Sequence, residues 1–193
     1  MISKKTDVPD NCYGDDVEAV LVDHETLHAR IAEMARAASD RYRDEDEDTI
    51  LVCVLKGATY FIADFARAMD IPTQMEFMVV SSYGSSAHSS GTVEIIMDLK
   101  RDIRGRNVII LEDIIESGIT LSWLVSDLAA RGPKNLEVIT LLRKPEAVQK
   151  QVDASEVGFE IPNDFVVGYG LDFAERYRNL PYVGVLKPEI YEK

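Results

Sequence analysis

Unbroken apolar runs alternate along this chain with segments whose apolar positions recur at helical spacing. In chain order the pattern predicts a strand at 18–22, a helix at 23–42, a strand at 49–55, a helix at 58–70, strands at 73–84, 91–99 and 107–113, a helix at 120–132 and a strand at 136–144, then short strands and turns over 164–190. Asp23 is placed to cap the first of these helices, and Gly132 with Pro133 ends the third.

This alternation predicts an α/β fold with a mainly parallel central sheet flanked by helices. The strands at 49–55, 107–113 and 136–144 show no polar alternation, which is typical of parallel strands buried on both faces. A polar pair stands at the end of each: Lys56-Gly57, Glu112-Asp113 and Arg143-Lys144. Ligands gather at the carboxyl ends of strands in such sheets, so we expect the three pairs along one functional edge.

Length and composition set bounds on the function. The chain has 193 residues, 46% apolar and 28% charged, as expected for one globular domain, and its net charge is -13. That charge argues against a nucleic-acid or membrane-surface partner, which would need clustered Lys and Arg. Cys12 and Cys53 do not suggest a disulfide framework. With neither a signal-peptide pattern nor a long apolar run, the sequence predicts a cytoplasmic protein.

The segment "ILEDIIESGITLS", residues 110–122, carries the main chemical signal. Glu112 and Asp113 at a strand end can hold the two hydroxyls of a ribose or reach a hydrated Mg²⁺. Ser117, Gly118 and Thr120 lie where a helix starts, and its free backbone N–H groups favour a phosphate. An ordinary capped surface turn would explain the hydroxyl residues but not the carboxylate pair beside a buried strand.

The stretch "VIILEDIIESGITL" at 108–121 resembles the phosphoribosyl-pyrophosphate motif of the type I purine phosphoribosyltransferase family, and specifically of its hypoxanthine-guanine phosphoribosyltransferase members. Further segments match in order over roughly residues 20 to 187: "VLKG" at 54–57, "SSYG" at 81–84, "LLRK" at 141–144, "GFEIP" at 158–162, "FVVGYGLD" at 165–172 and "RYRNLPYVGVL" at 176–186. The resemblance implies transfer of a 5-phosphoribosyl group from its pyrophosphate donor to N9 of hypoxanthine or guanine, in a single domain with a hood formed by about 1–22 and 160–193. It also implies Mg²⁺ as cofactor and a homodimer or homotetramer.

The resemblance also assigns roles to residues. Glu116 would be the catalytic acid/base near N7 of the purine, at a position where the family usually has Asp. The ribose and Mg²⁺ would be bound by Glu112 and Asp113, and the 5′-phosphate by Ser117, Gly118, Ile119 and Thr120, with no side-chain contact expected from Ile119.

Pyrophosphate would be bound by Lys56, Gly57 and Arg178, with a cis peptide bond before Lys56. The purine would be bound by Lys144, Phe165, Val166 and Asp172, and Asp172 would also approach a second Mg²⁺. Ser82 and Tyr83 would belong to a mobile loop at 81–91 that closes over the site.

Other readings of the sequence stay open at this stage. A xanthine-preferring transferase and a nucleic-acid-binding regulator on the same fold are the alternatives. "HETLH" at 24–28 matches a two-histidine zinc pattern but lacks a third ligand in sequence. The basic stretch 100–106 is the one basic cluster, and we expect it to be a solvated turn.

Overall fold

The computed structural model describes residues 6–82 and 93–192, so the mobile loop predicted at 81–91 lies almost wholly outside the described residues. The elements are β1 (Val17–Val22), α1 (His24–Tyr42), β2 (Thr49–Val54), α2 (Thr59–Ala68), β3 (Thr73–Ser82), β4 (Val93–Met97), β5 (Asn107–Ile115), α3 (Ile119–Ala130), β6 (Asn135–Arg143), a 3-10 turn (Pro145–Ala147), β7 (Glu156–Glu160), β8 (Val166–Val167), β9 (Val183–Leu186) and α4 (Pro188–Tyr191).

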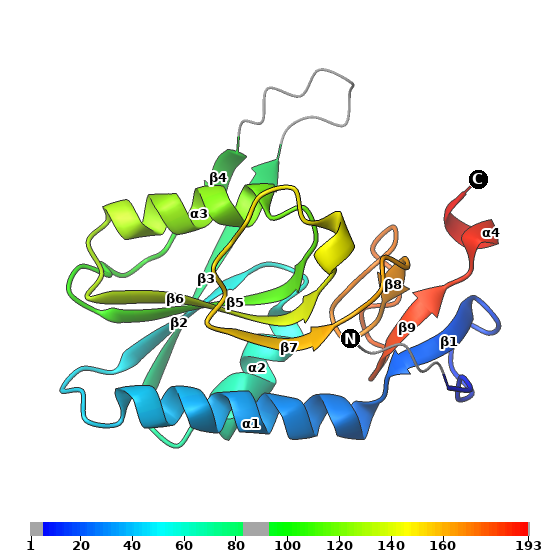
Figure 1. The fold of residues 1–193 in the computed structure, drawn as a ribbon, viewed down its shortest axis with the longest axis horizontal. Coiled ribbons are helices and arrows are strands. Elements are labelled where there is room, and N and C mark those ends of the chain that lie inside the picture. The colour runs from blue at the N-terminus through cyan, green and yellow to red at the C-terminus, as the bar shows by residue number, and fades with distance from the viewer. Residues whose placement is uncertain (1–5, 83–92, 193) are drawn as a thin grey trace.

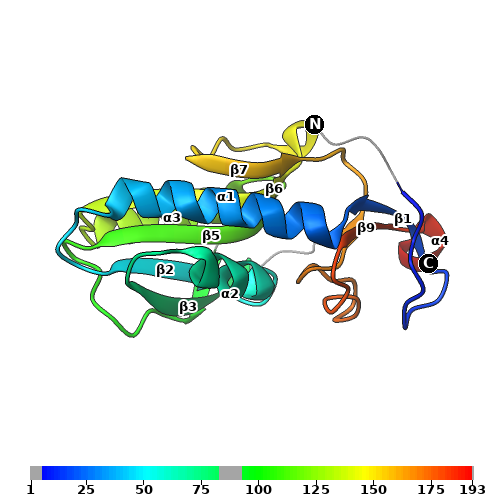
Figure 2. The same ribbon diagram turned by 90° about the horizontal axis from the view of Figure 1, so that it is seen from below.

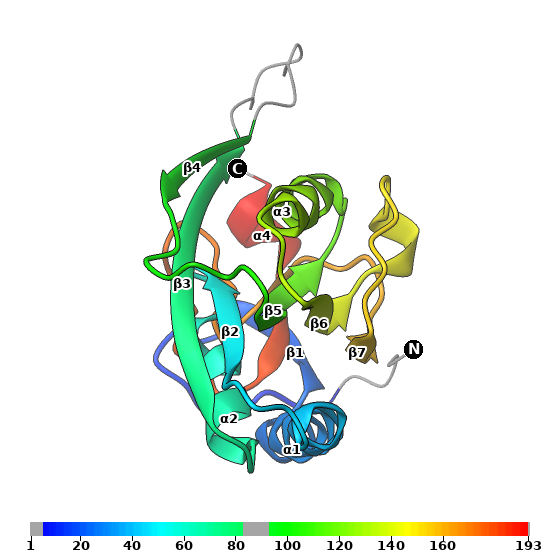
Figure 3. The same ribbon diagram turned by 90° about the vertical axis from the view of Figure 1, so that its left-hand side faces the viewer.

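The main sheet has six strands in the order β4-β3-β2-β5-β6-β7. Every neighbouring pair is parallel except β3 and β4, which are antiparallel. Helices α1 and α2 cover one face and α3 covers the other (Figures 1 and 3). The predicted fold class, a mainly parallel sheet flanked by helices, is confirmed.

The central strands are buried on both faces, because alternate residues of each strand pack into two separate hydrophobic cores. On β2, Leu51 and Cys53 pack with α1 and α2, whereas Ile50 and Val52 pack with α3. The two central strands are therefore apolar at almost every position, as a sheet covered on both sides requires.

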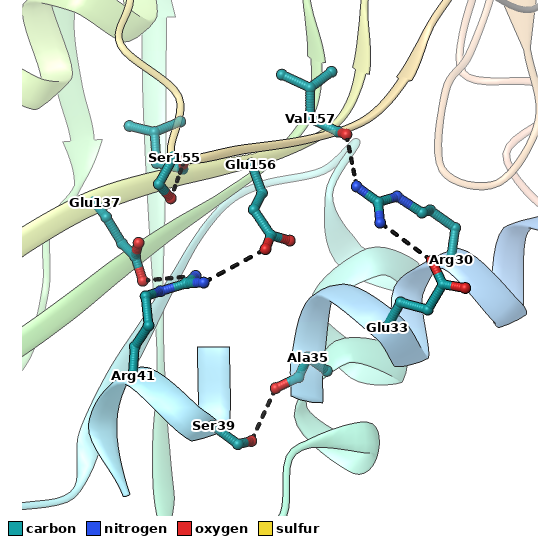
Figure 4. A network of polar contacts seen from close by, with 10 residues as sticks. Arg30, Glu33, Ala35, Ser39, Arg41, Glu137, Ser155, Glu156 and Val157 are labelled. Carbon is teal, nitrogen blue, oxygen red and sulfur yellow. Dashed lines mark hydrogen bonds and ion pairs between the residues drawn. The ribbon is translucent and has the colours of Figure 1, made fainter. Parts of the chain in front are cut away.

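Helix α1 begins where the sequence predicts, because the Asp23 side chain accepts a hydrogen bond from the Thr26 backbone N–H at 2.8 Å. The helix lies along the sheet in the view from below (Figure 2). Two arginines attach it to β6 and to the edge strand β7 (Figure 4): Arg30 donates to the Val157 carbonyl at 3.1 Å, and Arg41 pairs with Glu137 of β6 and Glu156 of β7.

A second sheet, in the order β1-β9-β8, joins the start of the described chain to its end. It stands beyond the carboxyl ends of the parallel strands (Figure 1) and has its own core around Tyr177, which is fully buried. We propose that this sheet and its flanking turns form the hood expected at about 1–22 and 160–193.

Two details differ from the sequence prediction. Strand β7 was not predicted: it is a half-buried edge strand, and Gly158 at its centre is a residue that usually argues against a strand. Strand β5 also runs beyond the predicted end at 113, to Ile115. It does so because β6 continues beside it, pairing Leu142 with Ile114 and Arg143 with Ile115.

Candidate active site

The adjacent carboxylates Glu112 and Asp113 lie within β5, which continues to Ile115, and not at its end as the sequence pattern indicated. Both are half-buried. Burial raises the pKa of Glu112 well above its usual range, with a further rise from the neighbouring Asp113 charge. Burial also raises the pKa of Asp113 to about 6, although the Ile114 backbone N–H donates to its Oδ1 at 2.8 Å. Two partly desolvated carboxylates side by side favour a cation or a set of hydroxyl donors between them.

Three segments meet closely around Gly57. A Cβ added to Gly57 would lie 1.6 Å from Asp113 Oδ2, and one added to Gly170 would lie 1.9 Å from the Gly57 carbonyl oxygen. Gly57 follows β2 and Gly170 belongs to the turn after β8, so the absence of side chains lets these backbones approach β5. The predicted cis peptide bond between Leu55 and Lys56 is present. The predicted convergence of the strand ends is thus confirmed for β2 and β5.

The turn from β5 into α3 borders a cavity of its own. Gly118 is the residue before the helix, with a left-handed φ of 74°, and an added Cβ would lie 2.2 Å from the Lys150 carbonyl oxygen. A cavity of about 230 Å³ opens here and is lined by Glu112, Asp113, Ile114, Ile115, Glu116, Ser117, Gly118, Thr120 and Leu121. Ile119 does not line it, and its side chain is exposed.

A second cavity, of about 240 Å³, adjoins the first through Asp113, Ile114 and Glu116. Its other lining residues are Gly57, Lys144, Phe165, Val166, Leu171, Asp172 and Arg178. Residues from four distant parts of the chain, predicted separately to contact one purine and its donor, therefore surround one space.

Lys144 is the buried cation of this cavity, only 5% exposed, and its ammonium pairs with the Glu116 carboxylate. It follows directly after β6, where its backbone N–H donates to the Ile115 carbonyl at 3.0 Å. The Lys144–Glu116 pair places a hydrogen-bond donor beside a hydrogen-bond acceptor, an arrangement that can bind the edge of a planar heterocycle.

Phe165 and Val166 form the apolar part of the cavity. Phe165 is partly exposed; Tyr191 of α4 stacks on it with ring centroids 4.6 Å apart, and Phe173 meets it edge-on at 5.7 Å. Val166 is buried at the start of β8, where it pairs with Val185. The aromatic ring is thus held in place by its neighbours rather than by the ligand.

Arg178 and Asp172 lie at the mouth of the same cavity. The Arg178 guanidinium donates to the Gly170 carbonyl at 2.7 Å and pairs with Asp172 Oδ1 at 2.8 Å, while its buried Nε has no hydrogen-bond partner among the described residues. Lys56 does not line the cavity. Its exposed ammonium pairs instead with Glu175 at 2.8 Å.

Sequence reasoning missed five residues of this region. Ile114, Ile115, Leu121 and Leu171 line the cavities, and an apolar residue beside a buried strand gives no signal for that in sequence. Glu175 carries a charge in a turn, which is usually solvated. Ser82 is the last residue of β3, and Tyr83 lies outside the described residues, so their predicted place in the loop stays a prediction.

The histidines of "HETLH" contact each other and α2. Their ring centroids are 4.2 Å apart, and His28 Nε2 lies 3.6 Å from Asp64 Oδ2. Within residues 6–82 and 93–192, no group of three or more His, Cys, Asp or Glu side chains is arranged to hold a metal ion. The carboxylates at the site nevertheless fit Mg²⁺, which takes one or two protein carboxylates and completes its shell with substrate oxygens and water.

Comparison with known proteins identifies the family. Residues 23–174 match the phosphoribosyl transferase domain. The chain is 54% identical over 189 residues to the hypoxanthine-guanine phosphoribosyltransferase of Mycobacterium avium, covering 96% of this chain and 93% of that protein. It is 48% identical over 177 residues to the same enzyme of Bacillus subtilis (strain 168), covering 92% of this chain and 97% of that protein.

Solved structures agree with the sequence relatives. The hypoxanthine phosphoribosyltransferase of Staphylococcus aureus superposes with a TM-score of 0.90 at 38% identity, over 96% of this chain and 100% of that one. The Trypanosoma cruzi enzyme in complex with the product IMP gives a TM-score of 0.87 at 37% identity, over 95% and 100%. The chain therefore belongs to the phosphoribosyl transferase domain family and, within it, to the hypoxanthine-guanine phosphoribosyltransferases.

Proposed function

We propose that this protein transfers the 5-phosphoribosyl group from 5-phosphoribosyl 1-pyrophosphate to N9 of hypoxanthine or guanine, a purine-salvage reaction that yields IMP or GMP and pyrophosphate. The observation that carries the proposal is the pair of adjoining cavities at one edge of the sheet. One combines the carboxylate pair with the start of α3, and the other contains the buried Lys144–Glu116 pair beside Phe165.

Base recognition would depend on Lys144 and Glu116. The Lys144 ammonium would donate to the exocyclic oxygen of a 6-oxopurine, where adenine carries an amino group and offers no acceptor. Glu116 would accept the proton at N7 as N9 forms its bond to C1′ and the bond from C1′ to pyrophosphate breaks. Phe165 would stack on the ring, and the Val166 backbone would meet its edge.

The donor would be held through its phosphates and its ribose. The free backbone N–H groups at the start of α3, with the Ser117 and Thr120 hydroxyls, would bind the 5′-phosphate. Glu112 and Asp113 would accept hydrogen bonds from the ribose hydroxyls. Lys56, Gly57 and Arg178 would bind the pyrophosphate, stabilising the charge that develops on the leaving group.

Mg²⁺ would be held by Glu112 and Asp113 together with donor oxygens, and a second ion would lie near Asp172. When bound, it would neutralise pyrophosphate charge. The raised pKa of Asp113 supports this assignment, because a buried carboxylate beside another is stabilised by a cation.

Exposed apolar side chains support the proposal of a homodimer or homotetramer. Met75, Ile96 and Met97 on β3 and β4 and Tyr60 on α2 are 37% to 65% exposed, and Met75 and Met97 line one hollow. Large exposed apolar side chains that lie together mark interaction surfaces. Multi-angle light scattering of the purified protein would give its mass against 21.6 kDa per chain.

No helix in the described part of the chain is long and apolar enough to cross a membrane. Cys12 and Cys53 are both free thiols. Free cysteines are typical of reducing compartments, which supports the proposal that the enzyme works in the cytoplasm.

The test is nucleotide formation from the phosphoribosyl donor and Mg²⁺, with hypoxanthine, guanine, xanthine and adenine supplied separately. We expect product with hypoxanthine and guanine and none with adenine. Product with xanthine alone would favour the xanthine-preferring alternative. Donor binding without product from any base would contradict the proposal and favour a regulator.

A further inference from the structure

The turn over residues 172–178 has an unusual backbone. Ala174, Glu175 and Tyr177 all have left-handed φ angles, of 49°, 64° and 74°, although none of them is glycine. Residues with a Cβ rarely adopt this conformation, and where they do they cluster at functional sites. The turn is therefore held in a conformation that its own sequence does not favour, which raises the question of what it positions.

The turn brings the Glu175 carboxylate to two cations at once. Its Oε2 lies 2.8 Å from Lys56 Nζ, and its Oε1 lies 3.3 Å from Arg178 Nη2. The Glu175 backbone N–H donates to Asp172 Oδ2 at 2.9 Å, and Asp172 Oδ1 pairs with Arg178 at 2.8 Å. Glu175 is thus tied at its main chain and bridges Lys56 to Arg178 through its side chain.

These two cations are the side chains that we assign to pyrophosphate. Without an anion between them, Lys56 and Arg178 would repel each other across the mouth of the cavity. The bond with Lys56 lowers the pKa of Glu175, and Arg178 lowers it further, as expected for a carboxylate shared by two cations. Lys56 and Glu175 are 62% and 64% exposed, so water competes for the bridge and its opening requires little energy.

We propose that Glu175 is a displaceable anion, which occupies Lys56 and Arg178 in the donor-free enzyme and competes with the pyrophosphate group for them. This inference rests on the proposed function, because it concerns the pyrophosphate subsite. Glu175 would keep both cations in place between turnovers, weaken the binding of the donor, and help to expel the pyrophosphate product when it returns.

The experiment measures binding of Mg²⁺-pyrophosphate, by isothermal titration calorimetry, to the wild type and to Glu175→Gln. Exposed ion pairs are each worth a factor of roughly 1.4 to 5 in an equilibrium constant, and Glu175 forms two, so we expect the variant to bind pyrophosphate about 2- to 25-fold more tightly. The KM for the phosphoribosyl donor should fall in parallel. GMP, which carries no pyrophosphate, should bind both proteins equally. The amide introduced by Glu175→Gln could still accept a hydrogen bond from Lys56 or Arg178, so Glu175→Ala is a second variant without this bond. It should change pyrophosphate binding in the same direction.

Glu33→Gln is the matched control, because Glu33 is 58% exposed and forms a similar ion pair with Arg30 on α1. It removes the same net charge far from the cavity and should leave pyrophosphate binding unchanged. Unchanged or weaker pyrophosphate binding by Glu175→Gln would overturn the inference, as would equal tightening of GMP. Failure of the wild type to form nucleotide would instead refute the proposed function, so the two outcomes are distinguishable.

Discussion

Replacing Lys144 with Gln is the sharpest test of how this enzyme would read its base. The ammonium of Lys144 is 5% exposed and lines the cavity, so a base oxygen that accepts from it would do so away from bulk water. Hydrogen bonds to charged groups contribute about 1.5–3 kcal/mol. Since about 1.4 kcal/mol corresponds to a factor of ten, we expect kcat/KM for hypoxanthine to fall by roughly 10- to 150-fold.

Stability should change much less than activity in this variant. The partner that loses its cation, Glu116, has a side chain that is 53% exposed, so water can solvate its carboxylate after the substitution. We expect a loss of less than about 1 kcal/mol in the free energy of unfolding, since no charge is left both buried and unpaired. Urea denaturation would measure it.

The assay is the initial rate of nucleotide formation at subsaturating hypoxanthine, guanine and adenine. Lys134→Gln is the control: Lys134 pairs with Glu45, is 54% exposed and lines neither cavity. If Lys144→Gln kept kcat/KM for hypoxanthine within about threefold of the wild type, the role of the ammonium as the oxygen reader would be refuted.

Three further predictions follow from the geometry. Gly118→Ala should lower the free energy of unfolding by at least about 2 kcal/mol, because the new Cβ would lie 2.2 Å from the Lys150 carbonyl oxygen at a residue with a left-handed φ. Thermal denaturation would measure the loss. Gly14→Ala is the control and should lower it less, since Gly14 also has a positive φ but nothing lies within 4 Å of its added Cβ. In metal-free buffer the free energy of unfolding should decrease as pH rises from about 4 to about 6, because folding raises the pKa of Asp113 from 3.8 to about 6. This shift is worth at most roughly 3 kcal/mol. Denaturation at a series of pH values would measure the dependence, and Asp113→Asn should reduce it. Burial raises the pKa of Cys53 to about 12, so a thiol reagent at pH 7 should label only the exposed Cys12 in the native protein and both cysteines after unfolding, as counted by mass spectrometry.

The central sheet was predictable because a strand that is buried on both faces has a continuous run of apolar residues in its sequence. Strands β2, β5 and β6 are continuous apolar runs, and Asp23 caps α1 as its residue type indicates. Edge strand β7 left no such mark, since it is half-buried throughout and has glycine at its centre. Its place is decided by pairing with β6, which is a contact between residues distant in sequence.

The candidate site likewise contains residues that the sequence indicated and residues that only the structure revealed. Residue types that are costly beside an apolar strand, such as Glu112 and Asp113, indicated the site from sequence because folding alone does not require them there. Ile114, Leu171 and Glu175 gave no indication, because an apolar strand residue or a turn carboxylate is ordinary until its neighbours are known.

By itself, the sequence determined the family, the order of the elements that form the sheet interior and its helices, and the chemical groups of the site, since all of these depend on residue type and spacing along the chain. Tertiary structure alone decided which groups share a space. It set Asp113 against Gly57, paired Lys144 with Glu116, and placed Glu175 between Lys56 and Arg178. These contacts join segments up to 119 residues apart, and such distances are set by packing of the β1-β9-β8 sheet and its turns beyond the ends of the parallel strands, which no local pattern encodes.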